Sequence, residues 1–417
     1  MMQIDRVTAT PGVGAFFADD QAAITAGAPS DGFAYDAEPR TAGFDRVREP
    51  GEALLVDLTL SNGRVVRGDC AAVQYAAAGD RDPLFRAQAH AETVEKEVGA
   101  ALIDRDAGAL DTNTAVLEEL TVHSAVAYGV SQALVAAAAA TQETTRTRVL
   151  ADALGTTPTT SPVAVFGQSG AARRRAAEKM LLKRIPVLPH GLFNNLETMG
   201  SEGGRLIEYL SWLSERATEL GDGEYRPRFH IDIYGMLKQL FGPPYDRPAV
   251  IEYVGALQQA AAPYPLQLEE PMIAATRADQ IAAMSELRAG LADAGVDVDL
   301  VADEWCDCRA DIEAFVDAGA ADVVQIKTPD VGSVLESGRA VRYCAGTDTR
   351  AYLGGTCNET ALSARTSAHV ALATDAAQLL AKPGMGFDEG NAIVTNEMRR
   401  TLTRHRRSAR LGDQKTD

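Results

Sequence analysis

The chain has 417 residues, of which 24% are charged and 46% hydrophobic, and this length suggests two or three domains with a large core. The composition excludes a disordered chain, a collagen-like repeat and a disulfide-stapled miniprotein. The 40 basic and 58 acidic side chains leave a net charge of −18, which argues against a nucleic-acid partner. This charge is typical of a salt-adapted protein, and an ordinary acidic bacterial enzyme is the alternative.

No segment predicts a membrane span or a secretory leader. The longest apolar run covers residues 133–140, far short of the roughly 20 residues that cross a bilayer. The N-terminal stretch MMQIDRVTAT lacks the apolar region of a signal peptide. The 5 cysteines, an odd number, are expected to be reduced thiols. We therefore expect a cytoplasmic protein without a membrane or nucleic-acid partner.

The first 160 residues predict strands followed by helices. Strand-forming runs at 53–60 and 64–75 flank Asn62 and Gly63, a pair that tolerates positive φ and predicts a hairpin turn. Helical patterns follow at 89–103 and 112–154, and the second is long enough to break into more than one helix. The sequence GTTPTTSP at 155–162 indicates a linker. We expect an N-terminal α+β capping domain over 1–160 and a second domain over 161–417.

From residue 163 onward, short apolar strands alternate with helical stretches. This alternation predicts a parallel sheet, and eight such units in about 240 residues favour a closed (β/α)8 barrel of the TIM type. A doubly wound open sheet is the structural alternative. Neither glycine-rich phosphate-binding pattern is present in the sequence. The expected strands are 163–166, 187–189, 229–234, 266–269, 299–303, 323–327, 351–354 and 379–382.

Charged side chains end four successive predicted strands. Asp232, Glu269 and Asp303 end three of them, and Lys327 ends the next. Because chemistry in such barrels sits at the C-terminal ends of the strands, these side chains are expected to share one site. Carboxylates are hard oxygen ligands that suit Mg²⁺, and three in one cavity would repel each other without a cation. A partly desolvated lysine beside that cation is expected to have a lowered pKa and to serve as a base.

The two-residue period of a strand selects which side chains point inward. The apolar residues on either side of Asp232 are then expected to face the helices. The same alternation places Glu269, rather than Glu270, inside the barrel. Gln325 and Lys327 are two residues apart and share a face.

The order Asp, Glu, Asp, Lys on successive strands resembles the enolase superfamily, and seven short segments are similar to the methylaspartate ammonia-lyase (3-methylaspartase) family. FADDQ at 17–21 also resembles the N-terminal region of that family, and by analogy residues 16–20 would fold over the barrel mouth. One departure is EEP at 269–271, where the family pattern has Glu-Gly-Pro. The seven segments are FGQSG (166–170), VLPH (187–190), HIDIYG (230–235), VADEWC (301–306), VQIKTPD (324–330), GGTCNET (354–360) and AKPGMG (381–386).

The resemblance implies a magnesium-dependent carbon–nitrogen lyase that releases ammonia from (2S,3S)-3-methylaspartate and gives mesaconate. Asp232, Glu269 and Asp303 would bind Mg²⁺, and Lys327 would remove the C3 proton. His190 would hydrogen-bond the substrate from the other side and act as base for the opposite C3 epimer. The resemblance also implies a homodimer, with K⁺ as an activating cation. The positions that match substrate contacts are Gln168, His190, Gln325, Thr356, Cys357 and Leu380.

Two other functions stay open at this point. A different enolase-type reaction, such as an epimerase or an acid-sugar dehydratase, would use a similar metal site. Epimerases of that kind commonly carry lysines on two opposing strands, whereas His190 stands opposite Lys327 here. A non-catalytic barrel would bind no Mg²⁺, so stabilisation of the fold by Mg²⁺ would argue against it.

Overall fold

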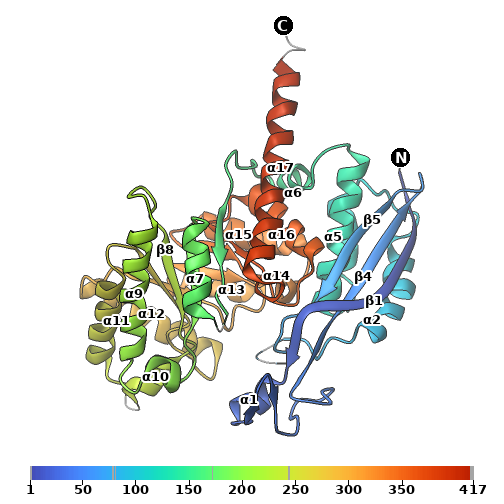
Figure 1. Ribbon diagram of the computed structural model, residues 1–417. Helices are drawn as coiled ribbons and strands as arrows, with labels where there is room; N and C mark the ends of the chain where they lie inside the picture. Colours follow the sequence, from blue (N-terminus) through green and yellow to red (C-terminus); the bar gives the residue numbers. More distant parts are fainter. Residues whose placement is uncertain (1, 78, 80, 171, 243–244, 414–417) are drawn as a thin grey trace.

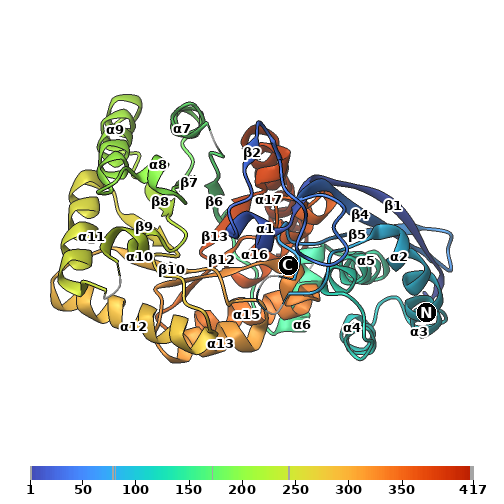
Figure 2. The same cartoon turned by 90° about the horizontal axis from the view of Figure 1, so that it is seen from below.

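The computed structural model describes residues 2–77, 79, 81–170, 172–242 and 245–413. A cap built from the N-terminal sheet and its helices lies beside a closed barrel that is surrounded by helices (Figure 1). In the view from below, α1 (Gln21–Thr25) of the cap lies between the cap sheet and the barrel strands (Figure 2).

A three-stranded antiparallel sheet forms the body of the cap. β4 (Arg48–Leu60) and β5 (Val65–Ala71) are the predicted hairpin, and Gly63 in its turn has a φ of 79°, which glycine adopts without strain. The third strand, β1 (Ile4–Asp19), was not predicted, because its proline and glycines are poor strand formers and mask the alternation. A separate short hairpin consists of β2 (Ser30–Asp31) and β3 (Ala34–Tyr35).

The cap helices follow the predicted pattern with more interruptions. The segment predicted at 89–103 consists of α2 (Ala87–Thr93), a π-helical turn η1 (Val94–Val98) and α3 (Gly99–Leu102). The long pattern at 112–154 breaks, as expected, into α4 (Leu110–Glu118), α5 (Ser124–Thr141) and α6 (Arg146–Leu154).

Helix α5 packs directly on β5 through small residues. A Cβ added at Gly68 would lie 1.9 Å from the Gly129 carbonyl oxygen, and one at Gly129 would lie 2.3 Å from Cys70 Sγ, so neither position has room for a side chain. Among the described residues, α5 is long and apolar enough to cross a membrane by length and composition alone. However, 83% of this stretch is buried inside the protein, as in a core helix of a folded domain. No span was predicted from the sequence, because the uninterrupted apolar run 133–140 covers only part of this helix.

After the linker, eight parallel strands close into a barrel in which β13 pairs back with β6. Every predicted strand coincides with an observed one to within a few residues, which confirms the (β/α)8 fold. The strands are β6 (Ala164–Gly167), β7 (Val187–Leu192), β8 (Arg228–Asp232), β9 (Leu266–Glu269), β10 (Asp299–Ala302), β11 (Val323–Ile326), β12 (Arg350–Leu353) and β13 (Gln378–Ala381).

Helices cover the outside of the barrel, and the far end of α17 extends away from its body (Figure 1). The arginine-rich run at 399–410 lies in α17. The helices are α7 (Arg173–Leu182), α8 (Leu196–Met199), α9 (Gly204–Leu220), α10 (Met236–Phe241), α11 (Arg247–Ala261), α12 (Arg277–Asp293), α13 (Arg309–Asp317), α14 (Thr328–Val331), α15 (Val334–Ala345), α16 (Ala361–Thr374), the 3-10 turn η2 (Pro383–Met385) and α17 (Phe387–Asp413).

The two faces of the barrel strands contribute to separate cores. Ile231, Leu268 and Ile326 belong to the large core between strands and helices, as the alternation predicted. The residues that alternate with them point into the barrel, where polar side chains gather at the C-terminal end. The apolar layer inside the barrel consists of Phe166, Val187, Val301, Val323, Tyr352 and Leu380.

Candidate active site

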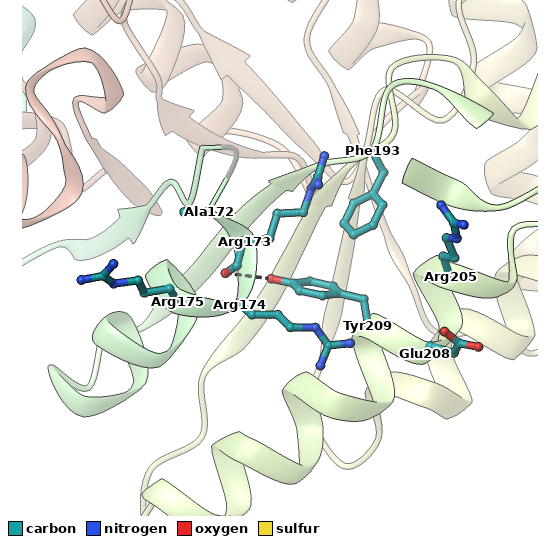
Figure 3. A pocket seen from close by; sticks show the side chains of 8 residues that line it. All are labelled: Ala172, Arg173, Arg174, Arg175, Phe193, Arg205, Glu208 and Tyr209. Carbon is teal, nitrogen blue, oxygen red and sulfur yellow. Dashed lines mark hydrogen bonds between the residues drawn. The ribbon is translucent and has the colours of Figure 1, made fainter. Parts of the chain in front are cut away.

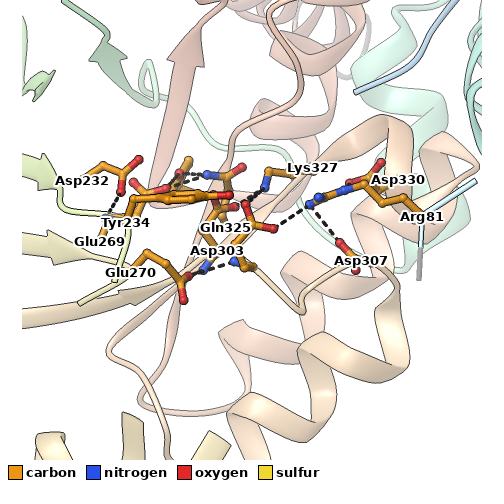
Figure 4. Close-up of polar contacts among 12 residues, drawn as sticks. Arg81, Asp232, Tyr234, Glu269, Glu270, Asp303, Asp307, Gln325, Lys327 and Asp330 are labelled. Atoms are coloured by element: carbon orange, nitrogen blue, oxygen red, sulfur yellow. Dashed lines mark hydrogen bonds and ion pairs between the residues drawn. The ribbon is translucent and has the colours of Figure 1, made fainter. Parts of the chain in front are cut away.

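Three carboxylates converge at the C-terminal ends of β8, β9 and β10 (Figure 4). Asp232 and Glu269 are register partners in neighbouring strands, and Glu269 is aligned in turn with Val301. Asp303 lies two residues beyond Val301 and therefore points to the same side of the sheet. Asp232 is 6% exposed, Glu269 0% and Asp303 8%. The three residues predicted to bind a metal thus line one buried wall.

Lys327 follows β11 and brings its ammonium group to this wall. Its Nζ lies 2.6 Å from Asp303 Oδ1 and 3.8 Å from Glu304 Oε1. Although burial opposes the charge, these two carboxylates raise the pKa of Lys327 above its ordinary value. Among the protein groups alone, this ion pair therefore holds Lys327 in its charged form. The lowered pKa expected from the sequence applies to a lysine beside a bound cation.

The three carboxylates of this wall carry more negative charge than the neighbouring side chains neutralise. Burial and two neighbouring glutamates raise the pKa of Asp303 to about 7, although the ammonium of Lys327 acts in the opposite direction. Burial and the charge of Glu269 raise the pKa of Asp232 well above its ordinary value. Hard oxygen donors that repel each other in a buried site fit a divalent cation such as Mg²⁺.

His190 stands at the end of β7, on the far side of the barrel mouth from Lys327. β7 and β11 are four strands apart in the eight-stranded ring, so their ends face each other. His190 Nε2 lies 3.1 Å from Glu269 Oε2 and 4.0 Å from Asp232 Oδ2, while Gln168 Nε2 lies 2.8 Å from His190 Nδ1. Burial works against its charge, but Glu269 and Asp232 raise the pKa of His190 to about 9.

Glu269 is the centre of a hydrogen-bonded group inside the barrel. Its Oε2 accepts hydrogen bonds from His190 and His230. Its Oε1 accepts from Gln325 Nε2 at 2.9 Å and from the Tyr352 hydroxyl at 2.9 Å. His230 and Tyr352 were not predicted. The strand period could have identified His230, which lies two residues before the carboxylate that ends its own strand, whereas Tyr352 gave no such signal.

Two overlapping groups of side chains could hold a metal ion. Among the described residues, His190, His230 and Glu269 offer ligand atoms that all lie within 4.8 Å of one another. The predicted ligands Asp232, Glu269 and Asp303 share one wall, but two of them contact other side chains. Lys327, which follows β11, forms an ion pair with Asp303. His190 and His230 form hydrogen bonds with Glu269.

Glu270 occupies the position where the resembled pattern has glycine. Its φ of 46° lies in the left-handed region that favours glycine. Its carboxylate accepts hydrogen bonds from the backbone N–H groups of Asp303 at 3.0 Å and Glu304 at 2.9 Å. It also accepts a hydrogen bond from the side-chain amide of Gln280. Burial and the two neighbouring acids raise the pKa of Glu270 well above its ordinary value. Glu269 is thus the inward residue, as predicted, and Glu270 supports the loop that carries Asp303.

Four of the six predicted substrate contacts lie within the barrel mouth. Gln168 and His190 contact each other, and Gln325 contacts Glu269, as described above. Leu380 on β13 belongs to the apolar layer inside the barrel and is 6% exposed.

The other two predicted contacts, Thr356 and Cys357, lie in the loop after β12, where the barrel meets the cap. Cys357 Sγ lies 3.0 Å from Gln74 Oε1 of the cap. Gln74 Nε2 donates to Asp19 Oδ2 at 2.6 Å, and Arg48 Nε donates to Asp19 Oδ1 at 2.7 Å. Asp19 lies in the FADDQ segment that was singled out from the sequence, whereas Gln74 and Arg48 were not predicted, because their partners are distant in the sequence.

The N-terminal segment that resembles the family lies against the barrel end. Asn358 Nδ2 donates to the Phe17 carbonyl oxygen at 3.0 Å, and Gln21 Nε2 donates to the Tyr234 hydroxyl. Tyr234 lies two residues beyond Asp232, which ends β8. This placement agrees with the expectation that the segment folds over the barrel mouth.

A cavity of about 520 Å³ lies next to the end of β7, where α7 and α9 begin (Figure 3). Arg173 Nε donates to the Leu192 carbonyl oxygen at 2.8 Å, and the Arg174 guanidinium stands 4.6 Å from the centre of the Trp212 ring. Arg173, Arg174, Arg175 and Arg205 form an arginine-lined rim around this cavity. Within the described part of the chain, none of these four arginines forms an ion pair with a carboxylate, so the rim is locally positive. The cavity is lined by Ala172, Arg173, Arg174, Arg175, Phe193, Arg205, Glu208 and Tyr209.

Family models and curated relatives point to one family. The family model "Methylaspartate ammonia-lyase N-terminus" matches residues 2–155, and "Methylaspartate ammonia-lyase C-terminus" matches residues 157–407. The methylaspartate ammonia-lyase of Haloarcula marismortui is 60% identical over 411 residues, which cover 97% of both chains. That of Clostridium tetanomorphum is 44% identical over 408 residues, covering 96% of this chain and 98% of the relative.

Solved structures show the same architecture. The methylaspartate ammonia lyase of Citrobacter amalonaticus, crystallised containing (2S,3S)-3-methylaspartic acid, has a TM-score of 0.93 and 43% identity, covering 97% of this chain and 100% of that one. The Mg-complex of β-methylaspartase from Clostridium tetanomorphum has a TM-score of 0.91 and 43% identity, covering 96% and 98%. Muconate lactonizing enzyme from Pseudomonas fluorescens, at 16% identity and a TM-score of 0.57 over 89% and 84%, shares the fold.

A capped (β/α)8 barrel with carboxylates and a lysine at its strand ends defines an enzyme of the enolase superfamily. The two family models cover nearly the whole chain, and a curated relative is 60% identical. The chain therefore belongs to the methylaspartate ammonia-lyase family of carbon–nitrogen lyases.

Proposed function

We propose that the chain eliminates ammonia from (2S,3S)-3-methylaspartate to give mesaconate, in a reversible reaction. The observation that carries this proposal is the placement of Lys327 and His190 on opposing strand ends, with three buried carboxylates between them. The elimination needs a base at C3 and a means of stabilising negative charge on the adjacent carboxylate, and this site offers both. The Citrobacter amalonaticus relative contains this amino acid in its crystal structure.

Lys327 is the proposed base for the C3 proton. It can accept a proton only as the neutral amine, and its ion pair with Asp303 Oδ1 at 2.6 Å holds the ammonium form. A cation bound at Asp303 would weaken this ion pair and so favour the neutral amine of Lys327. Removal of the proton is followed by loss of ammonia from C2, which leaves the carbon–carbon double bond.

Asp232, Glu269 and Asp303 are the proposed Mg²⁺ ligands. Their shared wall, their hard oxygen donors and the raised pKa values of the two aspartates support this choice. The Clostridium tetanomorphum relative was solved as a Mg-complex. When bound, Mg²⁺ would act as a Lewis acid toward the substrate carboxylate next to C3. The histidines at the end of β7 and on β8 would orient Glu269 through its Oε2.

The remaining side chains are proposed to hold the substrate in place. His190 would contact the carboxylate next to C3 and would act as base for the opposite epimer. Leu380, in the apolar layer of the barrel, suits the C3 methyl group. The polar groups for the carboxylates and the amine are Gln168, Gln325, Thr356 and Cys357.

The organisation of the enzyme is part of the proposal. A capping domain over 1–160 and a catalytic barrel over 161–417 are supported by two family models that meet between residues 155 and 157. We also propose a cytoplasmic homodimer, with K⁺ as an activating cation. The arginine-lined rim would attract the anionic substrate to a chain whose net charge is −18.

The test follows the ultraviolet absorbance of the conjugated product. Purified protein in high KCl receives (2S,3S)-3-methylaspartate with Mg²⁺, and Lys327→Ala and Lys179→Ala are compared with it. Lys179 is a surface lysine paired with Asp388 and serves as the control. We expect activity in the wild type and in Lys179→Ala, none in Lys327→Ala, and none after chelation of Mg²⁺. A folded Lys327→Ala protein with wild-type activity would refute the assigned base.

A further inference from the structure

Arg81 is a cap residue whose side chain is buried among loops of the barrel. It lies in the segment 72–86 between β5 and α2, and its side chain is 3% exposed. Its Nε lies 2.7 Å from Asp330 Oδ2, and its Nη2 lies 3.2 Å from Glu304 Oε2 and 3.0 Å from Asp307 Oδ1 (Figure 4). One guanidinium therefore joins the cap to the segments that follow both β10 and β11.

Glu304 is shared between Arg81 and Lys327. Its Oε2 contacts the guanidinium, and its Oε1 lies 3.8 Å from Lys327 Nζ. Without Arg81, Lys327 would be the one cation among the described residues within ion-pair distance of Glu304. Buried carboxylates without a partner attract a nearby ammonium strongly, because little water screens them. The carboxylates of this cluster are Asp303, Glu304, Asp307 and Asp330.

We propose that Arg81 is a positioning residue for the reaction. By binding Glu304, it keeps that carboxylate from drawing Lys327 away from its place beside Asp303. By binding two more carboxylates of the barrel, it holds the cap segment against the strand ends. When the cap docks on the barrel through Arg81, the same contacts therefore keep Lys327 in place. This inference rests on the proposed function, since it takes Lys327 as the base.

Arg86, in the same cap segment, forms ion pairs that have no part in positioning Lys327. Its side chain is 33% exposed, and its Nη1 lies 2.7 Å from Glu49 Oε2 and 3.4 Å from Glu52 Oε1, both within the cap. Loss of Arg86 would weaken the cap without changing any group near the base. Arg81 and Arg86 therefore form a matched pair of variants.

The contacts of Arg81 use two separate parts of its guanidinium. The Nε atom points to Asp330, and Nη2 points to the two acids that follow β10. A lysine ammonium is a point charge on a flexible chain and cannot span these partners together. Arg81→Lys keeps a buried cation, and with it the fold, while it loses the bridge.

The experiment measures kcat, KM and the isotope effect of C3-deuterated substrate for the wild type, Arg81→Lys, Arg81→Met and Arg86→Met. Rates are expressed per folded molecule from circular dichroism. We expect both Arg81 variants to lose about 100-fold in kcat, with KM changed by less than about threefold and a larger isotope effect, because a displaced base slows proton removal. Arg86→Met should keep the wild-type kcat and isotope effect. Arg81 variants with wild-type kcat and isotope effect would overturn the proposal.

A second change tests the role of Glu304 directly. Glu304→Gln in the Arg81→Met background removes the carboxylate that is expected to capture Lys327, so kcat should recover by about tenfold relative to Arg81→Met. No recovery would contradict the proposal. If Arg81→Met does not fold, the same comparison is made in the Arg81→Lys background. Failure of the proposed function is recognised separately, because the wild type and Arg86→Met would then also form no mesaconate.

Discussion

The interface between α5 and β5 and the mouth of the barrel are both buried, but their chemistry is opposite. At Gly68 and Gly129 the two elements are in contact through backbone and small side chains, with no space left over. At the barrel mouth, Asp232, Glu269 and Asp303 are gathered although their charges repel. Close apolar packing stabilises the fold, whereas buried like charges cost stability and are retained for binding. Substitutions in the two regions should therefore have opposite effects on stability and on activity.

The largest effect on activity is expected from Asp232→Asn. The change removes a charge that Glu269 and Asp303 repel, so the thermal midpoint without Mg²⁺ should stay the same or rise. Activity should fall by at least about 100-fold, and the stabilisation by Mg²⁺ should disappear. Assays and melting curves with and without Mg²⁺ measure both effects. An Asn variant that Mg²⁺ still stabilises would exclude Asp232 as a ligand.

The converse effect is expected from Gly129→Ala. The new Cβ would lie 2.3 Å from Cys70 Sγ and 2.5 Å from its backbone nitrogen, so the free energy of unfolding should fall by about 3 kcal/mol. The rate per folded molecule should not change. Gly255→Ala, on the exterior helix α11, is the control, since its nearest neighbour is Val296 Cγ2 at 3.6 Å. Urea denaturation compares the variants, and equal losses of stability in both would contradict the packing argument.

A third prediction concerns an ionisable group that is buried outside the mouth. Burial lowers the pKa of His369 below its ordinary value of 6.5, and the hydrogen bond from His369 lowers the pKa of Glu397. The unfolded chain therefore binds protons more readily, and the free energy of unfolding should fall as pH drops below about 6.5. Protonation of the imidazole in the unfolded chain limits the His369 contribution to at most about 1 kcal/mol between pH 7 and 5.5. Urea denaturation of His369→Gln should show a shallower pH dependence, and an unchanged slope would refute this origin.

The smallest effect is expected at the arginine-lined rim. The double variant Arg174→Ala/Arg175→Ala should lower kcat/KM by about threefold at low ionic strength, because the rim attracts an anionic substrate. At about 1 M salt the effect should vanish, since the screening length falls to roughly 3 Å. Arg400→Ala, on the distant α17, is the control. A loss that persists at high salt would indicate a structural role.

The barrel could be predicted because its signals are local. Each strand is a short apolar run between turns, and alternation within a run places Glu269 inside and Glu270 outside. β1 was missed, since its partner β4 begins some thirty residues later and its own sequence lacks alternation. The ion pairs of Lys327 with Asp303 and Glu304 could not be predicted either, because they depend on distances that the tertiary structure sets.

The sequence by itself determined the class of fold, the ends of the strands and the acids and lysine that occupy them, because these follow from periodicity within a few residues. Only the tertiary structure decided what surrounds those groups. Arg81 meets Glu304 and Asp330 across 223 and 249 residues of chain, and His230 and Tyr352 meet at Glu269 from different strands. Such contacts arise from the closure of the barrel and the docking of the cap, and no local sequence pattern predicts them.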